Sequence, residues 1–244
     1  MTYLYLLKKS IKINSIAKFK DRPIWLHFFK FLANFIIPFF IILKFKPNTI
    51  TVINFFVGFL SILLLFIFNG SYFSYSILLY TIYNLLDCCD GGLARFYRNK
   101  TFFGKLIDSL SDVLFFSMIN FSLALYFYLK LDNIYILIMG SVSSIFICFN
   151  VFILDKFSSL VRWCNKENKN NFQPYIRKKY YSRLFYIFED LYIFGTISLV
   201  FLGENQEVSQ KILFLIFFVH TFNFFSNIGK HIYFGYKFLN YNKK

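Results

Sequence analysis

The chain has 244 residues, of which 57% are hydrophobic, and it carries a formal net charge of +15. This composition is far more apolar than that of an ordinary soluble domain, so it predicts an integral membrane protein. In a soluble protein so much positive charge would indicate nucleic-acid binding. Here the basic residues cluster at the ends of apolar runs, which argues against nucleic acid and favours membrane orientation and anionic lipid as a partner.

Residues 1–46 form a basic N-terminal region that precedes the main apolar runs. Within it, an apolar run starts at Asp21-Arg22-Pro23 and continues to Phe45, with Lys30 inside it and Pro38 interrupting it. We interpret this run as an amphipathic helix that lies on the cytoplasmic membrane surface. A spanning helix is the alternative.

Residues 47–244 are expected to form one all-α membrane domain with six transmembrane helices. A span requires about 20 apolar residues. Six runs meet this requirement. They are Ile50 to Phe68, Phe73 to Ala94, Phe103 to Tyr128, Ile134 to Leu154, Leu184 to Leu202, and Ile212 to Phe234.

The connections between these runs differ in charge. Those after the second and fourth runs hold most of the basic residues, whereas the opposite connections hold only Lys130 and Lys211. The positive-inside rule therefore places both termini and the turn that follows Arg95 in the cytoplasm. We expect the plasma membrane of a bacterium.

Four of the eight aspartates of the chain lie between Asp87 and Asp112, next to apolar segments. Charged groups at such positions are costly and need a cation or a wet cavity. On a helix, Asp87 and Asp90 share one stripe, and Asp108 and Asp112 share another. The residues between Arg95 and Gly104 can turn the chain, so the two stripes can face each other across an antiparallel helix pair.

Carboxylates that converge in this way raise each other's pKa and repel. Hard divalent cations take such oxygen ligands and leave positions open for water and phosphate. The pattern therefore predicts a metal site. An ion or proton pathway through a transporter or channel is the alternative from another functional class.

The full pattern is D-x-x-D-G-x-x-A-R, eight residues, then G-x-x-x-D-x-x-x-D. It resembles the signature of the CDP-alcohol phosphatidyltransferases at all eight fixed positions. The resemblance implies two divalent cations, Mg²⁺ or Mn²⁺, held by Asp87, Asp90 and Asp108. It also implies that Asp112 is the general base and touches a metal as well.

The resemblance implies a nucleotide site beside the metals. Arg95 would bind the pyrophosphate through its two-pronged guanidinium. Gly91, Ala94 and Gly104 would leave room for the cytidine. The entry Pro47-Asn48-Thr49-Ile50-Thr51 is a helix start with a capping residue when read alone. The resemblance implies that Asn48 and Thr51 lie beside the bound nucleotide.

The implied reaction transfers a substituted phosphate group from a CDP-alcohol to an alcohol acceptor, with release of CMP. The segment from Ile107 to Val113 is similar to the L-D-S-L-A-D run of bacterial members, which favours CDP-diacylglycerol as donor. The alternative is transfer of a phospho-alcohol head group from a soluble CDP-alcohol to a lipid or a lipid-linked glycan. The resemblance also implies a homodimer.

The acceptor site is less defined by the sequence. The basic segment from Lys156 to Arg183 would suit a phosphorylated acceptor, or it serves only as an orientation signal. Glu189 and Asp190 are candidates for the acceptor site. The alternative is that they are acidic residues at a helix end that only contact water. Three asparagines within the predicted spans are expected either to line the same substrate cavity or to form interhelical hydrogen bonds. They are Asn150, Asn223 and Asn227.

Overall fold

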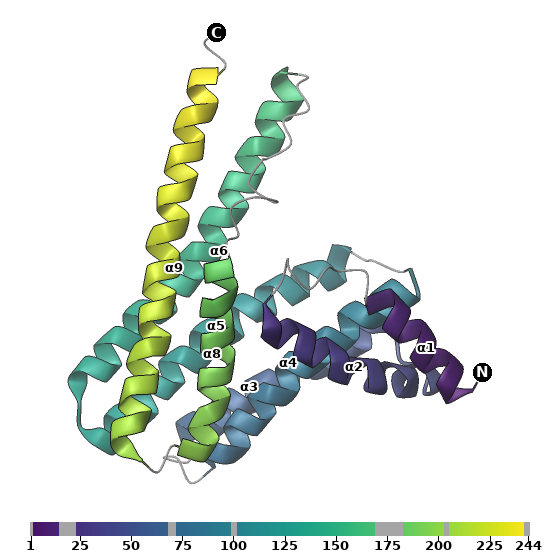
Figure 1. The fold of residues 1–244 in the computed structure, drawn as a ribbon, viewed down its shortest axis with the longest axis horizontal. Coiled ribbons are helices and arrows are strands. Elements are labelled where there is room, and N and C mark those ends of the chain that lie inside the picture. Colours follow the sequence, from purple (N-terminus) through teal and green to yellow (C-terminus); the bar gives the residue numbers. More distant parts are fainter. Residues whose placement is uncertain are drawn as a thin grey trace.

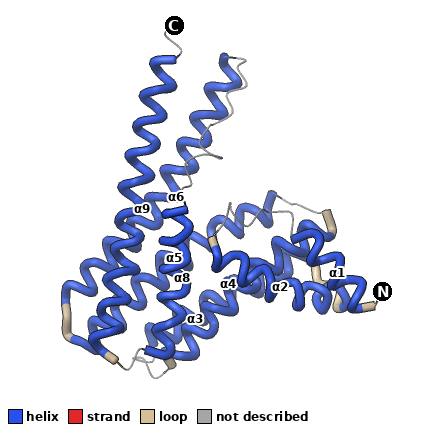
Figure 2. Tube along the Cα trace, in the orientation of Figure 1, coloured by secondary structure: helices blue, strands red, loops and turns tan. Residues whose placement is uncertain are grey.

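The computed structural model describes residues 2–14, 23–67, 72–98, 102–168, 183–202 and 205–241, and these residues form helices joined by short connections (Figures 1 and 2). The helices are α1 (Tyr3–Asn14), α2 (Ile24–Ile42), α3 (Pro47–Ile67), α4 (Phe73–Phe96), α5 (Phe102–Leu131), α6 (Ile134–Asn168), α8 (Arg183–Leu202) and α9 (Gln206–Tyr241). The all-α prediction is confirmed.

Five of the described helices are long and apolar enough to cross a membrane: α2, α3, and parts of α5, α6 and α9. Each of the six predicted spans coincides with a helix, but α4 and α8 are not among the five. Helix α2, which we expected on the membrane surface, is among them. The count of six and the surface position of α2 therefore stay predictions.

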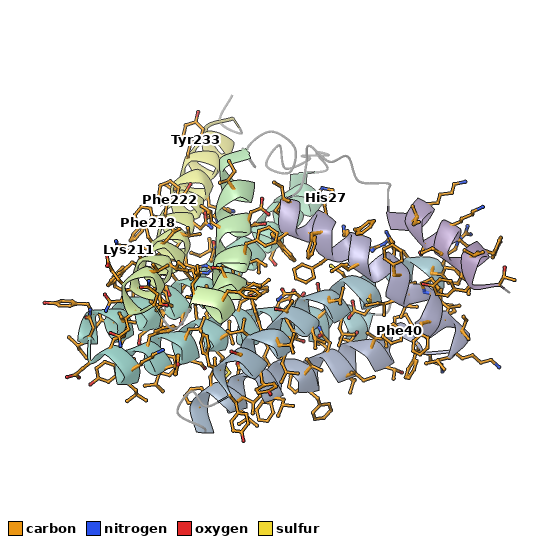
Figure 3. The ribbon with its side chains drawn as sticks, turned by 60° about the horizontal axis from the view of Figure 1, so that its bottom comes forward. His27, Phe40, Lys211, Phe218, Phe222 and Tyr233 are labelled. Carbon is orange, nitrogen blue, oxygen red and sulfur yellow. The ribbon has the colours of Figure 1, made fainter. Side chains whose placement is uncertain are left out.

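Aromatic side chains cover much of the outer surface. Phe218 and Phe222 lie on the outer side of α9, where 55% and 41% of their areas are exposed (Figure 3). Exposed apolar surface of this extent is unusual for a soluble monomer and is expected where helices contact lipid.

Helix α2 is fixed at its start by α8. Pro23 is the N-cap residue, and its side chain cannot accept a hydrogen bond from the first turn. The backbone N–H of Trp25 lies in that turn and has no partner within the helix. It donates to Asp190 Oδ1 at 2.6 Å. Asp190, which we considered for the acceptor site, therefore caps α2. Pro38 does not interrupt the helix, which continues to Ile42.

Helix α3 packs against both α4 and α5 and supports the two motif helices. Ser61 and Ser76 join α3 to α4, each donating to the other's backbone carbonyl, at 2.9 and 2.7 Å. Gly58 lets the rings of Tyr83 and Phe115 lie against α3, since a Cβ there would be only 3.0 Å from Tyr83. The motif helices are therefore held by a common neighbour.

Helix α6 is longer than the sequence indicated. We expected a loop from Lys156, but the helix continues to Asn168, and residues 169–182 lie outside the described residues. Figure 1 shows the last turns of α6 and α9 projecting together beyond the other helices.

The predicted orientation places this projection in the cytoplasm. Cys164 lies within it, so a membrane-impermeant thiol reagent is expected to label Cys164 only from the cytoplasmic side. An Asp132→Cys variant, in the opposite connection, should be labelled from outside intact cells. Labelling of Cys164 from outside, with loss of that label in Cys164→Ser, would invert the orientation.

Candidate active site

The motif carboxylates of α4 and α5 meet in the folded chain. One carboxylate oxygen of Asp87, one of Asp90 and one of Asp108 lie within 4.8 Å of one another. Asp90 is 7% exposed, and the other two are half-buried. The predicted convergence of the two stripes is therefore found for these three residues, which we call the carboxylate triad.

Asp112 lies one helical turn beyond Asp108 and outside the triad. Its Oδ1 accepts a hydrogen bond from the Tyr83 hydroxyl at 2.9 Å. Tyr83 is only 1% exposed, so it holds this carboxylate in a fixed position. Tyr83 precedes Asp87 by four residues and therefore shares its stripe on α4. That spacing is the signal by which the sequence would have revealed it.

Thr51 lies beside the triad. Its hydroxyl donates to Asp90 Oδ2 at 2.8 Å and lies 3.3 Å from the Pro47 carbonyl oxygen, and its side chain is 8% exposed. Asn48, at the first turn of the same helix, is exposed. The predicted entry segment therefore does adjoin the site, but the contact of Thr51 is with a carboxylate.

The remaining motif residues lie where α4 ends and α5 begins. The Arg95 side chain passes over Gly91, where an added Cβ would be 3.5 Å from the guanidinium. Ala94 and Gly104 are partly buried, and Arg95 is exposed. The nucleotide-binding roles of these residues stay predictions.

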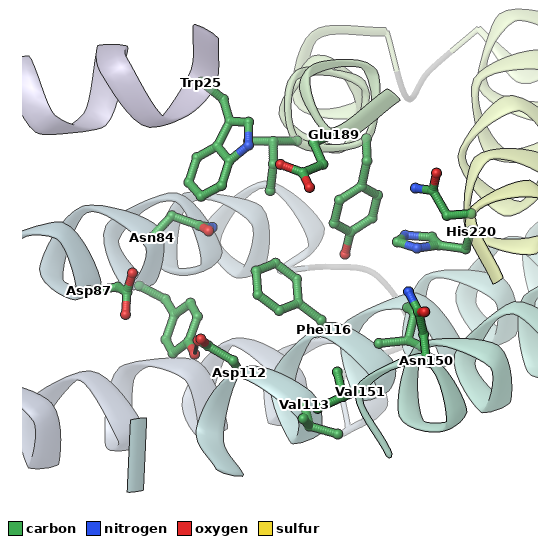
Figure 4. Close-up of a pocket in the computed structure, with 15 residues that line it drawn as sticks. Trp25, Asn84, Asp87, Asp112, Val113, Phe116, Asn150, Val151, Glu189 and His220 are labelled. Carbon is green, nitrogen blue, oxygen red and sulfur yellow. Dashed lines mark hydrogen bonds between the residues drawn. The ribbon is translucent and has the colours of Figure 1, made fainter. Parts of the chain in front are cut away.

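A cavity of about 370 Å³ adjoins Asp87 and Asp112. Helices α2, α4, α5, α6, α8 and α9 all contribute to its wall. Figure 4 shows Asp87 and Asp112 at one end, His220 and Asn150 at the other, and Trp25 and Glu189 between them. The residues that line it are Trp25, Tyr83, Asn84, Asp87, Asp112, Val113, Phe116, Ile147, Asn150, Val151, Glu189, Tyr192, Ile193, His220 and Asn223.

The cavity accounts for several polar residues within spans. Asn150 lines it and also accepts a hydrogen bond from the Asn227 amide at 2.8 Å, so both interpretations of the asparagines apply. Asn223 lines it as well. Trp25, Tyr192 and His220 were not anticipated, because no spacing relates residues on three helices that meet only in the folded bundle.

The triad fits a divalent cation such as Mg²⁺ or Mn²⁺. All of its donors are carboxylate oxygens, which these hard cations prefer. Three carboxylates this close repel one another unless positive charge lies between them. Asp112 is placed to reach the same region from the next turn of α5.

The family model for CDP-alcohol phosphatidyltransferase matches residues 44–222, well over half of the chain. No curated protein matches the chain. The matched segment contains the triad, Asp112, four of the six helices that line the cavity (α4, α5, α6 and α8) and the first part of α9. The chain therefore belongs to the CDP-alcohol phosphatidyltransferase family, and as a member it is a membrane enzyme that transfers a substituted phosphate group from a CDP-alcohol.

Proposed function

We propose that the enzyme transfers the phosphatidyl group of CDP-diacylglycerol to the hydroxyl group of a small alcohol. The acceptor oxygen forms a bond to the phosphatidyl phosphorus, the bond from that phosphorus to the bridging oxygen breaks, and CMP leaves. The observation that carries the proposal is the carboxylate triad, of which Asp87 lines a cavity of about 370 Å³. A cavity of that size suits a small ligand. The apolar outer surface suits a lipid donor.

The triad would hold the divalent cations, which would supply neutralisation of the charge on the pyrophosphate. Thr51 orients Asp90 within the triad. Arg95 binds the pyrophosphate from the exposed side of the site, where its guanidinium can form two hydrogen bonds to phosphate oxygens. The remaining task of the protein is positioning and electrostatics, as in other phosphoryl transfers.

Asp112 acts as the general base. It faces the cavity in which the acceptor binds, and the Tyr83 hydroxyl holds one of its oxygens, which leaves the other oxygen for the acceptor proton. We place this site on the cytoplasmic side of a plasma membrane, where CMP is released into the cytoplasm.

The proposal is tested with purified full-length protein in detergent, supplied with Mg²⁺ and CDP-diacylglycerol. CMP release is measured against serine, glycerol 3-phosphate, inositol phosphate and inositol, with and without the acceptor. Acceptor-dependent CMP release supports the proposal. Release only from a soluble CDP-alcohol with a lipid acceptor would reverse the direction of transfer, and no release from any donor would contradict the function.

Thr51 provides a separate test of the triad. Thr51→Val removes the hydroxyl that orients Asp90 and keeps the size of the side chain. Because the partners of metal ligands affect metal affinity by about 10- to 100-fold, the Mg²⁺ concentration for half-maximal activity should rise by about tenfold or more. Titration of activity with Mg²⁺ measures this effect, and the exposed Thr49→Val is the matched control.

If Thr51 acts on the nucleotide instead, the same variant would raise the KM for the donor and leave the Mg²⁺ requirement unchanged. Asn48→Ala serves as the comparison for a nucleotide contact, because Asn48 lies exposed at the start of the same helix.

A further inference from the structure

The cavity has an unusual charge for a site that would receive a phosphorylated molecule. Its charged lining residues are Asp87 and Asp112 at one end and Glu189 in the wall, and its described lining contains no lysine or arginine. Asp87 and Asp112 are assigned to the metal and to the base. Glu189 has neither task, yet it is half-buried and faces the space in which the acceptor must lie (Figure 4).

Two polar atoms in the cavity wall also lack a partner. Nε2 of His220 and Oδ1 of Asn223 are buried without a partner at hydrogen-bonding distance and angle in the described part of the chain. Buried polar groups without partners are costly and are rare in folded proteins. Both residues line the cavity, so a bound molecule with hydroxyl or amino groups would satisfy them.

These groups are held in place by contacts with neighbouring side chains. The His220 ring packs edge-on against Tyr192, with 4.3 Å between ring centroids, and the Tyr192 hydroxyl lies 3.4 Å from that of Tyr80. The capping bond from Trp25 N–H to Asp190 fixes the indole beside Glu189. The wall is therefore preorganised, as a selective site requires.

We propose that the acceptor of this enzyme is an alcohol that carries neither a phosphate nor a carboxylate group, and that Glu189 determines this selectivity. The acceptor lies between Glu189, His220 and Asn223 with its reacting hydroxyl toward Asp112. A phosphate or carboxylate there would face Glu189 with no lysine or arginine in the described lining to balance its charge. Such like-charge contacts are strongly unfavourable. Both an uncharged polyol and an amino alcohol meet the requirement. The inference rests on the proposed transfer reaction and narrows its acceptor.

The first test compares acceptors in matched pairs with the purified protein, Mg²⁺ and CDP-diacylglycerol. The pairs are glycerol with glycerol 3-phosphate, inositol with inositol phosphate, and ethanolamine with serine. In at least one pair, the enzyme should release CMP about tenfold faster with the acceptor that lacks an anionic group than with its anionic counterpart, because the anion must approach Glu189. Preference for glycerol 3-phosphate, inositol phosphate or serine would overturn the inference while leaving the transfer reaction intact.

The second test changes Glu189 itself. Glu189→Gln removes the charge and keeps the shape, so the ratio of kcat/KM between the preferred acceptor and its anionic counterpart should fall by about fivefold or more, with the donor KM little changed. An unchanged ratio would overturn the role of Glu189. Glu207→Gln is the matched control, because Glu207 is an exposed acid that pairs with Lys211 on α9, and it should leave the ratio unchanged.

Glu189→Gln and a further variant, Asn223→Ala, distinguish an amino alcohol from a polyol as the acceptor. If the acceptor is an amino alcohol, Glu189→Gln should raise its KM by about tenfold, since a buried charge pair is lost. If it is a polyol, Asn223→Ala should raise its KM more than Glu189→Gln does. Absence of CMP release with every alcohol in the wild-type protein would instead contradict the transfer reaction itself.

Discussion

Asp108→Asn is expected to abolish turnover while the protein remains folded in the membrane, and Asp87→Asn is expected to do the same. Each substitution keeps the size of the side chain and removes the negative charge from one of three residues that each place a carboxylate oxygen within 4.8 Å of the others. Loss of a residue that only supports a metal ligand costs about 10- to 100-fold, so loss of a ligand should exceed about a hundredfold. CMP release at saturating Mg²⁺ measures the effect.

The folded state is checked separately by monodisperse elution in detergent and by the thermal unfolding temperature. Removing one of three crowded carboxylates relieves repulsion, so neither variant should be less stable than the wild type. Asp132→Asn, at an exposed position between α5 and α6, is the matched control and should retain full activity. Near-normal turnover of either triad variant would contradict the metal site.

Asp112→Asn is expected to lower kcat by about 10²- to 10⁴-fold, the usual contribution of general-base catalysis, while donor binding changes much less. The triad and Arg95 would still hold the metal and the pyrophosphate in this variant, but the amide could not take the proton of the acceptor hydroxyl. Turnover and the binding of a labelled CDP-lipid are measured side by side.

Two comparison variants define the role of Asp112. Tyr83→Phe keeps the carboxylate and removes the 2.9 Å hydrogen bond that orients it, so kcat should fall by less than in Asp112→Asn. Arg95→Ala should weaken donor binding through loss of a charge-assisted phosphate contact. A collapse of donor binding in Asp112→Asn, together with normal binding in Arg95→Ala, would reverse the two roles.

Much of the motif region was predictable because helical periodicity is local. The spacing of Asp87 and Asp90, and that of Asp108 and Asp112, places each pair on one face of its helix whatever the rest of the chain does. The turn between Arg95 and Gly104 then allows the faces to meet. The helices around the motif were also predictable, because long apolar runs satisfy their backbone hydrogen bonds only as helices in a membrane.

The contacts between distant helices were not predictable from the sequence. Thr51 was recognised as a residue near the site, but its bond to Asp90 depends on how α3 packs against α4. Asp190 was considered for the acceptor, and its capping of α2 depends on a contact across 165 residues of chain. Lys156 was read as the start of a loop because charge increases there, although charged residues continue a helix readily once it leaves the apolar layer.

Helix α2 lies outside the matched residues 44–222, yet Trp25 forms part of the cavity wall and is anchored there by Asp190. Asp112 would accept a proton from water as readily as from an alcohol, and attack by water would turn the transferase into a hydrolase that wastes its lipid donor. Excluding water requires a complete wall around the bound alcohol. We therefore expect the balance between transfer and hydrolysis to depend in part on an N-terminal helix that precedes the matched segment.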